Sequence, residues 1–181
     1  MACKKLSACF ADSCLNQKPG VANIYLINFE DISSITTNVT GAVSAITYDS
    51  TLTGTTNWYS YIVQREVASF DGSNEINIQN SVSVNRPKLA FKLGGLEQSQ
   101  LDLYDVLAES RVIAVFENVS GELMLIGVRN GLNATTLQLM NESAANGFKG
   151  INITLEGLNE KLYLLETAFA TTFKASHLHS C

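Results

Sequence analysis

The chain has 181 residues, of which 46% are hydrophobic and 16% are charged, and its formal net charge is −5. This length fits one domain with a substantial core, and so small a charged fraction favours a surface that contacts other subunits. With 12 basic against 17 acidic residues and no basic cluster larger than Lys4-Lys5, the composition argues against specific nucleic-acid binding.

Residues 1–19 are predicted to form an amino-terminal arm that ends at Pro19-Gly20. Asp12 interrupts the short apolar run that follows Lys4-Lys5, so we expect no signal peptide. Gly20–Phe29 is the first predicted strand, because it is rich in branched and aromatic residues after a turn signal.

Glu30–Asn57 is rich in Ser, Thr, Gly and Asn, and we expect long loops there apart from one strand at Ala42–Tyr48. Asp49–Asn57 contains one charge and one large apolar residue, so it cannot form a core of its own, and we expect an inter-subunit loop. A free surface loop is the alternative. The candidate oligomer-interface residues are Leu52, Thr53, Gly54 and Thr55.

The next predicted strand, Trp58–Val63, brings Trp58, Tyr59 and Tyr61 together. An aromatic stripe of this kind can bind the face of a sugar. Its place in a series of strands favours packing in a core or an interface instead.

An antiparallel meander is expected to follow. Residues 71–74 have the composition of a turn before a strand that contains Ile76. Lys88–Leu93 then alternates between apolar and basic residues, as a half-buried strand requires, and Gly94-Gly95 ends it.

Apolar residues at helical spacing predict an amphipathic helix over about 98–108. We expect Leu101, Tyr104 and Leu107 to anchor it on a sheet. Four carboxylates on or beside it are candidates for a glycosidase pair, but the outer face of a helix favours simple solvation. They are Glu97, Asp102, Asp105 and Glu109.

Val112–Phe116 and Leu123–Gly127 are near-continuous apolar strands, and the turn residues between them predict a hairpin. Neither approaches the ~20 apolar residues that a membrane-spanning helix needs, so no membrane segment is expected. Gly150–Gly157 is a further alternating strand. Leu158–Thr167 fits either a helix or a strand, and its type stays open.

Residues 158–181 are predicted to form a carboxy-terminal extension. His177, His179 and Cys181 alternate in it and are candidate metal ligands, although an unstructured tail is the favoured interpretation. All four cysteines lie in the two terminal segments at wider spacing than zinc sites favour, so we expect reduced thiols of minor structural importance.

Seven or more short strands and one helix predict a mainly β fold, an antiparallel β-sandwich or barrel over residues 20–157 with one flanking α-helix. The sequence contains no phosphate-binding loop, nucleophile elbow or metal-protease motif, and both histidines lie in the terminal extension. We therefore expect no enzyme activity, no catalytic residues, no metal and no cofactor.

The ordered blocks Gly20–Ile32, Trp58–Phe70, Pro87–Ala108 and Val112–Leu132 resemble a group of small structural proteins from tailed phages of Bacteroides-type hosts. The group includes ring and tail-tube-like proteins of crAss-like phages. The resemblance covers most of the chain from residue 20 to about residue 157. The arm and the extension depart from it, which leaves open whether the protein builds a repeating tube or a single ring.

This resemblance implies a tail-tube-like β domain that assembles with itself as a closed ring in the neck or tail conduit of a virion. Adjacent neck or tail proteins would be its partners, and double-stranded DNA would pass through without specific binding. Low charge and long polar loops are compatible with such a subunit. The alternative is a secreted carbohydrate-binding or adhesin β-sandwich module that uses Trp58, Tyr59 and Tyr61 as a stacking platform, and the expected lack of a signal peptide counts against it.

Overall fold

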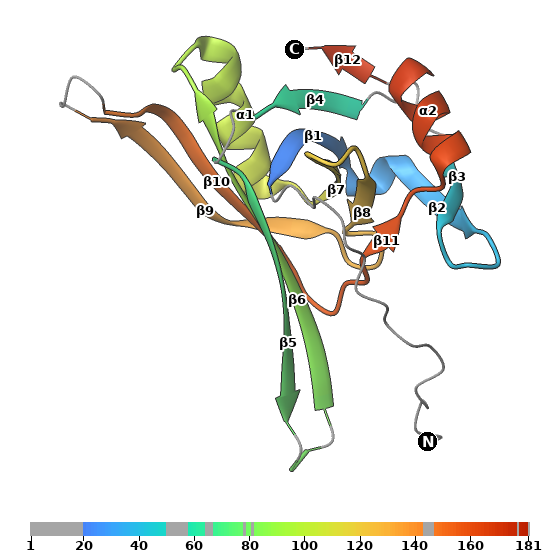
Figure 1. The fold of residues 1–181 in the computed structure, drawn as a ribbon. Coiled ribbons are helices and arrows are strands. Elements are labelled where there is room, and N and C mark those ends of the chain that lie inside the picture. Colours follow the sequence, from blue (N-terminus) through green and yellow to red (C-terminus); the bar gives the residue numbers. More distant parts are fainter. Residues whose placement is uncertain are drawn as a thin grey trace.

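The computed structural model describes residues 20–49, 58–63, 67–77, 79–80, 82–142, 147–176 and 178–180, and these residues form a mainly β fold, as predicted (Figure 1). In chain order the elements are β1 (Val21–Asn28), the 3-10 turn η1 (Phe29–Asp31), β2 (Ile32–Thr37), β3 (Val43–Tyr48), β4 (Trp58–Ile62), β5 (Ser69–Asn77), β6 (Val82–Gly94), α1 (Gln98–Glu109), β7 (Val112–Asn118), β8 (Leu123–Ile126), β9 (Leu132–Asn141), β10 (Lys149–Gly157), β11 (Tyr163–Leu164), α2 (Thr167–Ser176) and β12 (Leu178–Ser180).

The strands form one large sheet and a separate two-stranded sheet of β2 and β3. The large sheet has the order β12-β4-β1-β7-β9-β10-β6-β5, and β8 and β11 are added beside β7. β7 and β9 pair only at Val112 and Leu132, so the sheet is divided there into two halves that share a core, as in a sandwich. The described strands do not close into a barrel.

The central strands β1 and β7 are buried on both faces, which explains why their sequences are nearly continuous apolar runs. One face, with Ile24 and Ala114, packs with β6, β10 and α1. The other face, with Ile27 and Ile113, packs with β3, β8 and Phe173 of α2. The molecule therefore has two apolar cores, one on each side of the same pair of strands.

Several predicted elements are confirmed. These are the strands that correspond to β1, β3, β4, β6 and β10, the β7–β8 hairpin, and the helix α1. In α1, Leu107 is buried, and Leu103 and Tyr104 pack partly buried against the core. Leu101 is also partly buried. The predicted face of the helix is therefore the one that packs.

Two local predictions in the amino-terminal half are wrong. Residues 32–37 were expected to be loop but form β2, in which Ile32 and Ile35 are the partly buried positions. A register shift between Ile32 and Ser34 breaks the usual alternation, so the period of two is hidden. Residues 71–74 were expected to form a turn but lie inside β5, because pairing with β6 outweighs the local turn preference.

The carboxy-terminal extension is also more ordered than predicted. It contributes β11 and a second helix, α2, which was not predicted. The ring of Phe173 lies edge-on to the rings of Tyr25 and Trp58, with centroids 5.6 and 5.1 Å away. Residues 178–180 form β12, parallel to β4, so the unstructured-tail interpretation is wrong for them.

The remaining predictions for the terminal segments and for one loop fall outside the described residues. These include the arm, the four cysteines and His177. The candidate interface residues Leu52, Thr53, Gly54 and Thr55 also lie outside them.

Candidate functional site

One part of the large sheet is a four-stranded unit with the order β9-β10-β6-β5, which we call the four-stranded sheet. It consists of two hairpins, β5–β6 and β9–β10, joined along β6 and β10. Gly94, at one end of β6, pairs with Gly150 near the β9–β10 turn, whereas Val82–Pro87, at the other end, extends past β10 and pairs with β5. The two hairpins therefore point away from the body in different directions (Figure 1).

Both outer edges of the four-stranded sheet are open. Among the described residues, β5 has no strand on its outer side, and β9 has none there beyond Leu132. Open edges carry unpaired N–H and C=O groups and are templates for pairing with another chain. Each edge also holds an apolar side chain in water, Ile76 on β5 at 68% exposure and Leu139 on β9 at 50%.

The face of this sheet that points away from the core is polar and electrically balanced. One cross-strand row contains Asp71, Lys88 and Glu156, which face one another across three strands. Arg86 lies with its Nε 3.3 Å from an oxygen of Glu75 and its Nη1 3.6 Å from an oxygen of Glu156. The next rows contribute mainly hydroxyl and amide groups, from Ser69, Thr136, Gln138, Asn152 and Thr154.

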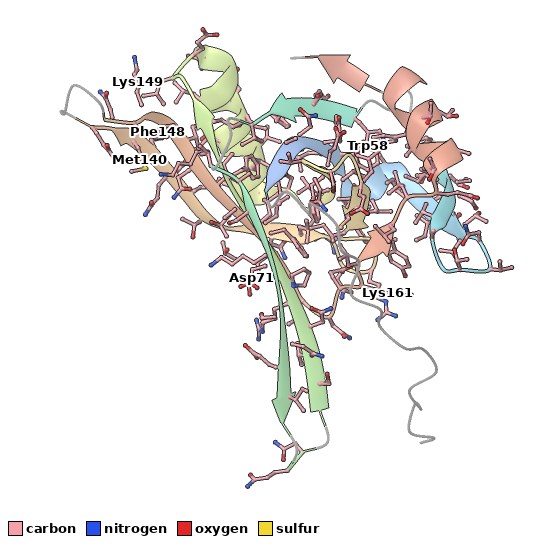
Figure 2. The ribbon with its side chains drawn as sticks, viewed as in Figure 1. Trp58, Asp71, Met140, Phe148, Lys149 and Lys161 are labelled. Carbon is pink, nitrogen blue, oxygen red and sulfur yellow. The ribbon has the colours of Figure 1, made fainter. Side chains whose placement is uncertain are left out.

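Two apolar side chains, Met140 and Phe148, lie near the far end of the β9–β10 hairpin. Figure 2 places Met140, Phe148 and Lys149 together there, away from Asp71 on β5. The ammonium of Lys92 lies 5.2 Å from the centre of the Phe148 ring, a cation–π distance. This contact ties the polar face of β6 to the end of the neighbouring hairpin.

A second polar cluster joins β1 to β7. The side-chain amide of Asn23 donates to Glu117 at 2.8 Å, and the Tyr25 hydroxyl donates to the same carboxylate at 3.3 Å. Burial, with the nearby Glu117 charge, raises the pKa of Tyr25 to about 12. The phenol therefore stays protonated and acts as a hydrogen-bond donor at neutral pH.

The structure tests the predictions for the aromatic stripe of β4 and for the carboxylates on and beside α1. Trp58 is fully buried and its indole N–H donates to the Tyr48 hydroxyl at 3.0 Å, so it packs in the core and cannot stack on a sugar in solution. The four carboxylates on and beside α1 are all exposed, as predicted.

Within the described ranges, no three His, Cys, Asp or Glu side chains are grouped so that they could hold a metal ion. No helix among those residues is long and apolar enough to cross a membrane. Comparison of the chain with protein-family models, with curated proteins and with solved structures finds no match.

Proposed function

We propose that the protein is a structural subunit of a tailed-phage virion that associates with itself as a closed ring in the neck or tail conduit. The observation that carries the proposal is the four-stranded sheet with two open edges and a balanced polar face. The resemblance of the sequence to ring and tail-tube-like proteins is the reason for proposing a virion as the assembly to which it belongs.

The direction of the strands supports head-to-tail association. Successive strands of the four-stranded sheet are antiparallel, so its two edge strands, β9 and β5, run in opposite directions. When β5 of one copy pairs antiparallel with β9 of the next, every copy keeps the same orientation. Rotational symmetry about a ring axis requires that arrangement.

The offset between the two edges supports closure rather than an open, flat ribbon. Ser73, the midpoint of β5, pairs with Arg86, and Leu137, the midpoint of the open part of β9, lies level with Phe91 through Ile153. The midpoints are thus five residues apart along β6, about 17 Å. The four strands of one copy span about 19 Å across the sheet. If β5 of one copy pairs with β9 of the next with their midpoints level, the strands tilt by about 40° relative to the ring axis. Closed β-barrels have tilts of about 35–45°.

The charge balance of the face that points away from the core supports a conduit through which DNA passes without being bound. Three basic and three acidic side chains share it and offset one another. A face that neutralised phosphates would need unpaired lysines and arginines, because release of counterions drives non-specific binding to DNA. Hydroxyl and amide groups hydrate well without fixing a phosphate in place.

The test is the assembly state of the full chain, measured by light scattering and by negative-stain images over a range of concentrations. Ile76→Lys and Leu139→Lys place a charge on one open edge each, and both should shift the population from rings to monomers. Both side chains are exposed, so neither change removes core packing.

Val39→Lys is the matched control, because Val39 is fully exposed on the turn between β2 and β3 and lies on neither edge. This variant should assemble as the unchanged protein does. A strictly monomeric mass at high concentration, together with absence of the protein from purified virions, would overturn the proposal. Rings that form equally well in all three variants would exclude the two edges as the interface.

A further inference from the structure

An apolar groove runs between α1 and strands β1 and β4. It is lined by residues of these three elements and has a volume of about 330 Å³. Its walls include Leu103, Val106 and Leu107 of α1, together with Tyr59 and Tyr61 of β4. Val106 is 56% exposed and Tyr59 is 44% exposed, so the apolar rim faces water. We call this feature the α1 groove.

One end of the α1 groove continues into a smaller acidic cleft of about 210 Å³. Asn28 and Ser110 line both cavities. Glu30 and Glu109 add two carboxylates to the cleft, and neither has a cationic partner among the described residues. The guanidinium of Arg111 is also in the cleft, 4.8 Å from the centre of the Phe29 ring, so the lining carries two negative charges and one positive charge.

The position of Glu109 is unfavourable for the helix itself. Glu109 is the last residue of α1, and the last turn of this helix contains no basic residue. Acidic side chains are disfavoured at a helix carboxyl end, where the helix dipole is negative, and cations are favoured there. A cation from another segment would relieve this repulsion and neutralise the cleft.

A serine hydroxyl group at the junction of the two cavities is available for a hydrogen bond. The Ser110 hydroxyl oxygen is buried, and it has no hydrogen-bond partner within the described part of the chain. Buried hydroxyl groups are nearly always hydrogen-bonded. A peptide backbone laid across the junction would supply a C=O or N–H to this oxygen.

We propose that the amino-terminal arm of the same chain binds in the α1 groove, with Lys4-Lys5 beside Glu30 and Glu109 and with Leu6 and Phe10 in the apolar part. This segment holds the largest basic cluster of the sequence directly before two large apolar residues. The arm carries three lysines against one aspartate, in a chain whose net charge is −5. Its charge therefore complements the cleft, and its apolar residues suit the groove.

The chain between Leu6 and the first strand is long enough to reach. The arm joins β1 at Val21, and Asn28, at the opposite end of β1, lines the groove. That length of strand is about 23 Å, whereas the roughly fourteen Cα-to-Cα steps from Leu6 to Gly20 span up to about 46 Å when extended. Because the arm is tethered to the same molecule, its effective concentration at the groove is of millimolar order, far above that of a second copy in dilute solution.

The arm's own cysteines provide the test in the full-length chain. Cys3, Cys14 and Cys181 are replaced by Ser, Cys9 is kept, and Val106→Cys adds one thiol on the rim of the α1 groove. A short bis-maleimide should then link Cys9 to position 106 within one molecule at least about tenfold faster than it links Cys9 to Val39→Cys. Val39 is the matched control because it is as accessible as any residue and lies away from the groove.

The charge contacts are tested in the same background. Lys4→Glu with Lys5→Glu should slow the intramolecular link several-fold, and adding Glu109→Lys should restore part of the rate. Equal rates for the Val106→Cys and Val39→Cys chains would overturn the proposal, and so would a rate that is indifferent to the lysine reversal. A product of twice the chain mass at low protein concentration would also overturn it, since the occupant would then be the arm of another copy.

Discussion

Glu160 is the buried carboxylate whose loss should cost the fold most. It is 1% exposed, and its two oxygens accept the backbone N–H groups of Arg129 and Asn130 at 3.0 and 2.5 Å. It thereby locks the loop between β8 and β9 to the segment after β10. Hydrogen bonds to a charged acceptor contribute about 1.5–3 kcal/mol each. Arg129 and Asn130 are exposed, so their N–H groups regain some water when the carboxylate is gone.

We therefore expect Glu160→Ala to lower the free energy of unfolding by about 2–4 kcal/mol, and Glu160→Gln, which keeps one acceptor oxygen, by about half as much. Urea unfolding followed by the fluorescence of Trp58 measures both, because this is the only tryptophan and it is fully buried. Glu122→Gln is the control, since Glu122 is exposed, and it should stay within about 0.5 kcal/mol of the unchanged protein. An Ala variant as stable as that control would refute the reasoning.

Three further predictions concern α1, Tyr25 and the loop before β4. Leu107→Ala should cost about 2–5 kcal/mol, because Leu107 is 3% exposed in the core, and an unchanged unfolding midpoint would show that α1 does not anchor there. Folding raises the pKa of Tyr25 from its ordinary value of 10.0 to about 12, so the stabilisation it contributes is present below pH 10 and is lost as the pH rises toward 12. The unfolding free energy of Tyr25→Phe should therefore fall less steeply with pH between 10 and 12 than that of the unchanged protein. Identical pH dependence in the two proteins would contradict this. Residues 50–56 are expected to form an inter-subunit contact in addition to the β5 and β9 edges. Replacing them by Asn-Gly should therefore keep the fold but shift the population from rings toward monomers, which the native mass of the variant checks, and unchanged assembly would make this loop a simple connector.

The sequence predicted elements whose periodicity is undisturbed. Leu89, Phe91 and Leu93 alternate without interruption, and all three are buried in β6. β2 was expected to be loop, and it contains a register irregularity at Ile32/Ser34. A bulge shifts the apolar residues by one position, and the pattern then matches neither strand nor helix. β1 contains a register irregularity as well, between Val21 and Asn23, but its nearly continuous apolar run predicts a strand without strict alternation.

The candidate surfaces could be predicted less well than the strands. The open edges depend on strand order, and the pairing of β10 with β6 joins residues about sixty positions apart in the sequence. The α1 groove is built from three separate segments, β1, β4 and α1, together with Val112. In the sequence, Ser110 is only the residue after a helix. Its buried oxygen becomes visible only when these segments are packed.

Because β1 and β7 are buried on both faces, their backbone hydrogen bonds should open less easily than those at the edges of the molecule. Amides in strands that are sealed on two sides exchange with solvent only through global unfolding, whereas those of an exposed two-stranded ribbon exchange through local opening. In β5, residues 71–76 are all exposed and rest on β6 alone. A neighbour that adds a strand to this edge therefore meets a segment that can adjust its twist and register at little cost, while the doubly packed centre keeps its shape.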